Sequence, residues 1–271
     1  MNKYLQLSLL GILLLYFFTF LLSSCTYTQK IRDGRTAYER KQYATAIPML
    51  RKEYKKAKRK TEQGQIAFLL GECYRRTNRP DEATGWYRTA YDYQFGMEAL
   101  KQYAYMLKES GQYQQAMQAF KDLGIELGSP YEYRREINAC QIALEWAETY
   151  RDSPYRVKPA DFNSPAAEYG PVLWKDEGLV ITSDRGTSTG EEMYNWTGRS
   201  FSDLFTVEEG ILLQMPEPLN SPSNEGTAAF NADFSEVFLT RCSSPGKFED
   251  AYCKIYSSRL EANSWSEPEP L

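Results

Sequence analysis

At three places in the first half of the chain, an alanine is followed four positions later by a large residue, as on the packed face of a helix. The pattern aligns on Ala46, Ala83 and Ala116, which are 37 and 33 residues apart. The large residues four positions after these alanines are Leu50, Tyr87 and Phe120. Small residues let two helices approach closely, and the large residue fills the gap to the next pair. The spacing therefore predicts three consecutive helix pairs.

The motif L-G-x2-Y at residues 70–74, followed by A-x3-Y and A-x3-F, resembles the signature of the tetratricopeptide repeat. The resemblance covers residues 30–150 and implies a stack of helix pairs with a concave groove for a peptide or a partner protein. The residues that carry it, each in a structural role, are Leu70, Gly71, Tyr74, Ala83, Tyr87, Ala104, Gly111, Tyr113, Ala116 and Phe120. A further helix over 131–150 is expected to cap the stack.

The helical half offers two candidate contact surfaces. The tyrosines that are candidates for lining the groove are Tyr38, Tyr74, Tyr103 and Tyr105, with a core role as the alternative for each. The basic run KKAKRK at 55–60 has helical flanks and no interleaved aromatic residues, so we interpret it as a solvated helix face. The sequence predicts no nucleic-acid partner.

The second half changes to short strand-like runs between turn residues. Two stretches that begin NSP, at Asn163 and Asn220, align with an offset of 57 residues as far as Asp176 and Asp233. A strand-like run follows each aspartate, LVITS and then VFLTR, and further runs DLFTV and KIYSS come later. Each stretch ends in PEPL. We expect the same four-stranded sheet to be built twice.

The stretches LWKDEGLVITS and FNADFSEVFLT resemble the WD40-like (PD40, TolB-type) propeller repeat at its aspartate turn and following strand. The resemblance implies blade-like sheets, in which Asp176 and Asp233 cap tight turns. The expected fold is a multidomain α + β chain, an α-solenoid followed by a partial β-propeller. Two blades do not close a ring, so we expect this sequence to be an N-terminal fragment of a longer protein.

The first 25 residues are typical of an export signal. Lys3 precedes an apolar stretch, Leu5 to Leu22, and the sequence LSSC ends at Cys25. That ending resembles the lipobox of bacterial lipoproteins, which implies lipidation of Cys25 and anchoring in the outer membrane, facing the periplasm. A plain signal peptide and a single membrane span are the alternatives.

The other four cysteines fall into two pairs of different character. Cys73 and Cys140 stand in helical patterns and are expected to be buried small apolar residues. Cys242 and Cys253 are eleven residues apart on either side of a loop-like segment, so an oxidising compartment would allow a disulfide between them.

Composition narrows the chemistry further. The chain has no histidine, which excludes histidine triads and histidine metal sites. Residues 26–150 hold 21 Lys and Arg against 16 Asp and Glu, whereas residues 151–271 hold 10 against 20. Two domains with different surfaces are therefore expected, and we predict no cofactor, no metal site and no catalytic residues. The predicted divisions are a signal peptide 1–25, a helical repeat domain 26–150, a linker 151–160 and a propeller part 161–271.

A lipobox, tetratricopeptide repeats and WD40-like blades, in this order, resemble a class of bacterial envelope lipoproteins of the OmpA family that is associated with type IX secretion and gliding. The resemblance implies a non-enzymatic scaffold that binds envelope proteins through both repeats. Proteins of this class bind peptidoglycan through a C-terminal domain that these 271 residues do not include, so no residue is assigned to it.

Two alternatives stay open at this point. The first is a glycan-binding lipoprotein of an uptake system, with Trp174, Trp196 and Trp265 as candidates for stacking on sugars. The second is the N-terminal part of a propeller-containing peptidase, although the sequence has no histidine that could act as the base of a serine triad.

Overall fold

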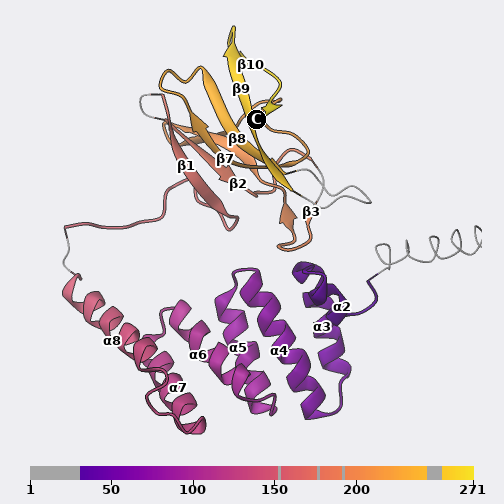
Figure 1. Ribbon diagram of the computed structural model, residues 1–271, viewed down its shortest axis with the longest axis vertical. Helices are drawn as coiled ribbons and strands as arrows, with labels where there is room; N and C mark the ends of the chain where they lie inside the picture. Colours follow the sequence, from indigo (N-terminus) through magenta and orange to yellow (C-terminus); the bar gives the residue numbers. More distant parts are fainter. Residues whose placement is uncertain (1–30, 152–153, 176–177, 191–192, 243–251) are drawn as a thin grey trace, which may run out of the picture.

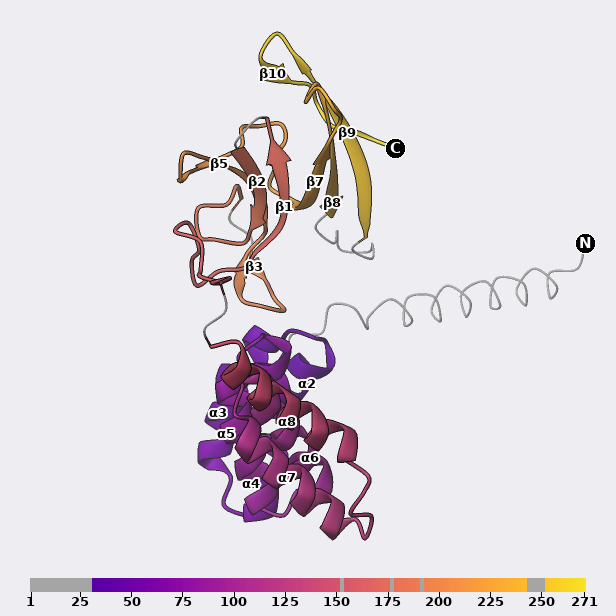
Figure 2. The same ribbon diagram turned by 90° about the vertical axis from the view of Figure 1, so that its left-hand side faces the viewer.

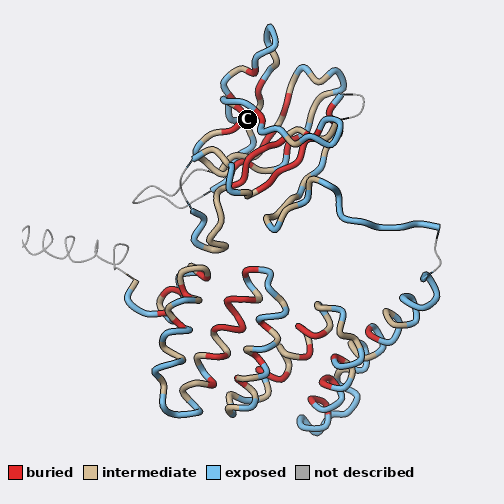
Figure 3. Tube along the Cα trace, turned by 180° about the vertical axis from the view of Figure 1, so that it is seen from behind, coloured by how far each residue is buried: buried red, intermediate tan, exposed pale blue. Residues whose placement is uncertain are grey.

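The computed structural model describes residues 31–151, 154–175, 178–190, 193–242 and 252–271. Within these ranges every helix precedes every strand, so the chain is an α + β protein (Figure 1). The described residues between the last helix and the first strand include 154–161, which are all exposed (Figure 3). They coincide with most of the predicted linker.

The helices form one array, the helical layer, in which each helix packs mainly on its neighbours in sequence and α2 also contacts α4 (Figures 1 and 2). Their bounds are α2 Gly34–Glu39, α3 Tyr43–Lys56, α4 Lys60–Arg76, α5 Pro80–Asp92, α6 Met97–Glu109, α7 Tyr113–Glu126 and α8 Arg134–Thr149. The last helix begins three residues later than the sequence pattern suggested. This neighbour-by-neighbour packing is what short loops between amphipathic helices favour.

Several helices of this layer end in the same way. After α4, Asn78 adopts a left-handed φ of 56°, and Arg79 donates its N–H to the carbonyl of Tyr74 at 2.9 Å. After α6, Gly111 has a φ of 73°, and Gln112 donates to the carbonyl of Leu107 at 2.9 Å. These bonds satisfy helix-end carbonyls that would otherwise lack partners. The turns after α4 and α6 therefore have a common geometry.

The strands form two larger antiparallel sheets. The first has the order β1-β2-β5-β6, and the second has the order β10-β9-β8-β7 with β11 paired to β9. The bounds in the first sheet are β1 Glu168–Trp174, β2 Gly178–Ser183, β5 Asp203–Glu208 and β6 Ile211–Gln214. The bounds in the second are β7 Asn224–Phe230, β8 Glu236–Cys242, β9 Cys253–Glu261, β10 Ser264–Trp265 and β11 Glu269–Pro270. A short hairpin, β3 Met193–Tyr194 and β4 Arg199–Ser200, lies between β2 and β5 in sequence.

The two sheets are stacked so that equivalent faces do not meet. Ile181 pairs with Phe205 in the first sheet, as Leu239 pairs with Tyr256 in the second. Leu239 and Tyr256 pack toward the first sheet, in a core with Val180 and Leu204. Ile181 and Phe205 instead belong to a separate cluster on the other face of the first sheet. The second sheet therefore follows the first head to tail, like successive units of a repeat.

Cys242 and Cys253 are directly opposite each other in the β8–β9 pair and form a disulfide with an S–S distance of 1.99 Å. The bond closes a loop with a sequence separation of eleven residues. A cross-link of this length restricts the unfolded chain more than the folded one. The disulfide is therefore expected to stabilise the second sheet, which contains both β8 and β9.

Reduction of this disulfide is expected to lower the free energy of unfolding of the second sheet by about 2–3 kcal/mol, the entropy change for a loop of this length. Urea unfolding with and without reductant measures the change. The matched control is the double variant Cys242→Ser, Cys253→Ser, which is expected to be as stable as the reduced protein and not to respond to reductant. An equal response of both proteins to reductant would contradict the assignment.

Candidate interaction surfaces

Most residues of the helical signature lie in the interior of the layer. Those that are buried are Leu70, Gly71, Tyr74, Ala83, Tyr87, Ala104, Ala116 and Phe120. Gly111 lies in the turn before α7, and Tyr113 is half-buried at the start of α7. The signature positions thus make contacts within and between the helix pairs and leave ligand contacts to other residues.

Gly71 and Tyr87 explain why a glycine stands in the L-G-x2-Y motif. A Cβ at position 71 would lie 2.7 Å from two ring carbons of Tyr87, which is fully buried. Because a ring inside a packed core has little room to move, even an alanine would force α4 and α5 apart. The glycine is therefore required by close packing of the two helices.

A buried polar network surrounds the Tyr87 hydroxyl. Tyr87 donates to Glu72 Oε1 at 2.5 Å, and Arg75 Nη2 lies 2.8 Å from Glu72 Oε2. Burial and the neighbouring Glu72 carboxylate raise the pKa of Tyr87 above its usual range. The network satisfies a carboxylate that is only 6% exposed. It fixes α4 against α5 through three side chains.

The four tyrosines proposed for a groove differ in accessibility. Tyr74 is 2% exposed, so the alternative core role applies to it. Tyr38, Tyr103 and Tyr105 are half-buried and pack against the helical cores. Tyr105 contacts Phe120 edge to face at a centroid distance of 5.2 Å. These three retain a partly accessible surface.

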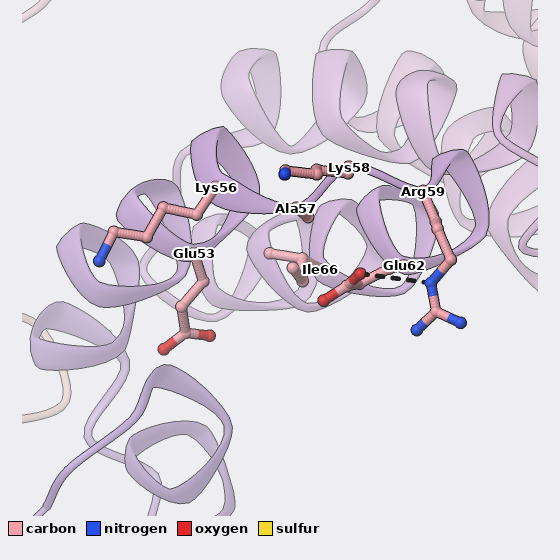
Figure 4. Close-up of a pocket in the computed structure, with 7 residues that line it drawn as sticks. All are labelled: Glu53, Lys56, Ala57, Lys58, Arg59, Glu62 and Ile66. Atoms are coloured by element: carbon pink, nitrogen blue, oxygen red, sulfur yellow. Dashed lines mark ion pairs between the residues drawn. The ribbon is translucent and has the colours of Figure 1, made fainter.

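The basic run lies at the junction of α3 and α4, beside a hollow of about 560 Å³ (Figure 4). The hollow is lined by Glu53, Lys56, Ala57, Lys58, Arg59, Glu62 and Ile66. Arg59 and Glu62 approach to 3.7 Å. The two carboxylates offset part of the positive charge, so this surface lacks the continuous basic and aromatic character of a nucleic-acid groove.

Each sheet contains a serine, a glutamate and an arginine in one cluster that is partly buried in the first sheet and more deeply buried in the second. In the second sheet Arg241 Nε donates to Glu225 Oε1 at 2.8 Å, and Ser221 donates to the same carboxylate from N and Oγ. The Arg241 guanidinium also donates to the carbonyls of Pro218 and Leu219. The cluster therefore attaches the NSP turn to strands β7 and β8.

The first sheet repeats this cluster with its own residues. Arg185 Nη2 lies 2.9 Å from Glu168 Oε1 and also donates to the carbonyl of Phe162. Ser164 donates to Glu168. In both sheets the guanidinium stands over an aromatic ring, that of Phe205 in the first and that of Tyr256 in the second. The NSP-x2-E motif thus has the same structural function in both units.

The carboxylate of Glu225 has an unusual pKa because its side chain is fully buried. Burial raises the pKa of Glu225 to about 7, and the nearby Asp203 carboxylate adds to the rise. Bonds from Ser221 and the positive charge of Arg241 act in the opposite direction. The protonated form of Glu225 is therefore favoured in the folded protein at mildly acidic pH.

This pKa predicts that the protein becomes less stable as the pH rises from 5 to 8. A carboxyl whose folded pKa lies above its unfolded value stabilises the fold below the unfolded pKa, and the effect is lost as pH passes the folded pKa. The expected decrease in unfolding free energy is about 2–3 kcal/mol. Urea unfolding at pH 5 and pH 8 measures it. The variant Glu225→Gln is expected to show little of this decrease, and an unchanged slope in that variant would contradict the assignment.

The three tryptophans of the glycan-binding alternative are all in contact with other parts of the protein. Trp174 and Trp265 are 6% and 9% exposed and pack with Phe230 between the two sheets. Trp196 is half-buried against the helices. Since stacking on a sugar needs an open ring face, these residues do not form a carbohydrate platform in this structure.

The remaining candidate residues are turn and terminal positions. Asp233 Oδ1 accepts bonds from the N and Oγ of Ser235 at 3.1 and 2.6 Å, which also lower the pKa of Asp233. This is the geometry of an aspartate that closes a tight turn. Asp176 and Cys25 lie outside the residues that the structure describes. The turn of the first unit and the lipidation of Cys25 therefore stay predictions.

Sequence reasoning aligned the two glutamates of the repeated cluster but missed the arginines. Glu168 and Glu225 are 57 residues apart, whereas Arg185 and Arg241 are 56 apart, so one rigid alignment does not superpose both. It also missed Glu72 beside Tyr87. From the sequence alone, a charged residue within a helix is expected to face solvent, because charged side chains are rarely buried without a partner. In both units an arginine follows the glutamate of the NSP-x2-E motif, by 17 residues in the first and by 16 in the second, and this recurrence was the available signal.

None of the helices within the described ranges has the length and apolarity needed to cross a membrane. A comparison of the sequence with models of known protein families and with curated proteins found no match.

Proposed function

We propose that this chain is a non-enzymatic scaffold lipoprotein of the bacterial envelope, anchored in the outer membrane through Cys25 and binding envelope proteins. The observation that carries the proposal is repetition. Helices pack on their sequence neighbours, and two sheets with the same Ser-Glu-Arg cluster follow head to tail. Arrays of this kind provide extended surfaces for other proteins.

The helical layer supports assignment to the tetratricopeptide class. Gly71 lies against Tyr87 where the signature has its small residue, and Phe120 is buried at the corresponding position of the next pair. The turns between paired helices contain Asn78 and Gly111 in the same left-handed conformation. The proposed groove would bind an extended or helical segment of a partner.

The sheets support assignment as two neighbouring blades of a propeller. In a sandwich related by twofold symmetry, equivalent faces would meet. Here Leu239 of the second sheet packs toward the first sheet, while its counterpart Ile181 faces the opposite way. Each sheet has at least four strands that are joined mainly in sequence order. Head-to-tail stacking of such sheets is the arrangement of propeller blades.

One apolar surface of the helical layer is suited to a protein partner. Ile142, Trp146 and Tyr150 stand four residues apart around α8, and Trp146 is 63% exposed. An exposed stripe of this kind on a terminal helix is a common feature of protein interfaces, where tryptophan and tyrosine contribute most of the binding energy. We propose that it contacts an envelope protein of the type IX secretion machinery, with which the lipoproteins of the same domain order are associated.

Two measurements in the native cells test the proposal. Metabolic labelling with a palmitate analogue is expected to label the wild type and not Cys25→Ala, which is also expected to leave the outer-membrane fraction. Chemical cross-linking is expected to join the wild type to a defined envelope protein. The variant Trp146→Ala is expected to lose that product, whereas Ile211→Ala, at a residue 60% exposed on β6, is expected to retain it. An unlabelled wild type that stays in the soluble fraction would overturn the anchoring, and the same products in both variants would overturn the assignment of α8.

A further inference from the structure

The hairpin β3–β4 reaches from the first sheet to the helices. Figures 1 and 2 both place β3 between the sheets and the helical layer. Met193 pairs with Ser200 and Tyr194 with Arg199, and Gly198 donates its N–H to the carbonyl of Tyr194 at 2.8 Å. These bonds form a tight tip that presents Trp196.

Trp196 makes a polar and an aromatic contact with the helices. Its Nε1 donates to the carbonyl of Arg76, the last residue of α4, at 2.8 Å. Its ring meets the ring of Tyr43 edge to face, with a centroid distance of 4.8 Å and an interplanar angle of 88°. Carbonyls in the last turn of a helix lack partners within the helix, so Arg76 offers an acceptor that an indole suits well.

The tip of the hairpin also packs closely against α3 at Gly198. A Cβ at Gly198 would lie 2.8 Å from the Cβ of Ala44 in α3, and the φ of Gly198 is 73°. Both the backbone conformation and the space available therefore require glycine. Ala44 directly follows Tyr43, so the tip of the hairpin meets α3 through two adjacent residues and α4 through one carbonyl.

We propose that the β3–β4 hairpin is a built-in ligand of the helical layer, which holds the sheets in one orientation and keeps the site around Tyr43 and the Arg76 carbonyl closed. The exposed segment 154–161 joins the two parts covalently and keeps the hairpin at a high effective concentration near its site. When the hairpin leaves, the site accepts a ligand of the same chemistry, an aromatic side chain with an N–H or O–H donor on a tight turn. This inference does not depend on the proposed envelope function.

A distance measurement on the full chain tests the proposal. Spin labels are placed at two exposed positions, Lys121→Cys on α7 and Glu261→Cys on β9, in a chain that also carries Cys25→Ser. The native thiols of Cys73 and Cys140 are buried and do not compete for the label. Pulsed dipolar spectroscopy then reports the distribution of distances between the helices and the sheets.

The wild type is expected to give one narrow distance peak. Trp196→Ala removes the contact from the hairpin side, and Ala44→Glu removes it from the helix side without altering the hairpin. Both are expected to broaden the distribution several-fold, while circular dichroism shows that the helices remain folded. The control Met193→Ala, at a residue of the same hairpin that is 61% exposed, is expected to keep the narrow peak. A broad wild-type distribution, or a narrow one in Ala44→Glu, would overturn the proposal.

Discussion

Tyr87→Ala is expected to destabilise the helical layer by about 3–5 kcal/mol, the usual cost of removing a large aromatic side chain from a packed core. Tyr87 is fully buried, and its ring lies against Gly71 of the neighbouring helix. The substitution leaves a cavity between α4 and α5. It also removes the hydroxyl that donates to Glu72, a carboxylate that is only 6% exposed. Urea unfolding followed by far-ultraviolet circular dichroism measures the loss.

Two variants separate the contributions at this position. Tyr87→Phe keeps the ring and is expected to cost about 1–3 kcal/mol, because only the bonds of the hydroxyl to Glu72 and Arg75 are lost. Tyr131→Ala, at a tyrosine 79% exposed before α8, is expected to change the unfolding free energy by no more than about 0.5 kcal/mol. If Tyr87→Ala resembled Tyr131→Ala, the close packing of α4 on α5 would not be important for stability.

Arg241→Met is expected to destabilise the second sheet by about 3–5 kcal/mol at pH 8, because it leaves a buried carboxylate without its ion-pair partner. The Glu225 side chain is fully buried, and Arg241 also donates to the carbonyls of Pro218 and Leu219. Methionine keeps most of the side-chain length, so the packing changes little. Urea unfolding measured through the fluorescence of the buried tryptophans between the sheets reports the change.

Two controls accompany Arg241→Met: a measurement at lower pH and the substitution of an arginine in an exposed ion pair. Glu225 can take up a proton at low pH, so the loss in Arg241→Met is expected to become smaller at pH 5. Arg259 is 74% exposed and lies 3.3 Å from Glu236, so Arg259→Met is expected to cost at most about 1 kcal/mol. An equal effect of the two substitutions would show that the buried cluster does not stabilise the sheet.

The sequence predicted the elements of this fold better than their contacts. Spacing along a helix and alternation along a strand are local properties, and they located the helices from Gly34 to Thr149 and the strands around Asp233. The contact between Trp196 and Arg76 joins residues 120 positions apart, and no local pattern encodes it. The burial of Trp174 and Trp265 was equally inaccessible, because an aromatic residue in a strand suits either a core or an open binding face.

The placement of the two ion pairs has a consequence for how such a protein changes over evolutionary time. Glu168 pairs with Arg185, and Glu225 pairs with Arg241, so each unit supplies both charges of its own pair. A gene duplication that copies one whole unit copies a complete pair with it, and no buried charge is left without its partner.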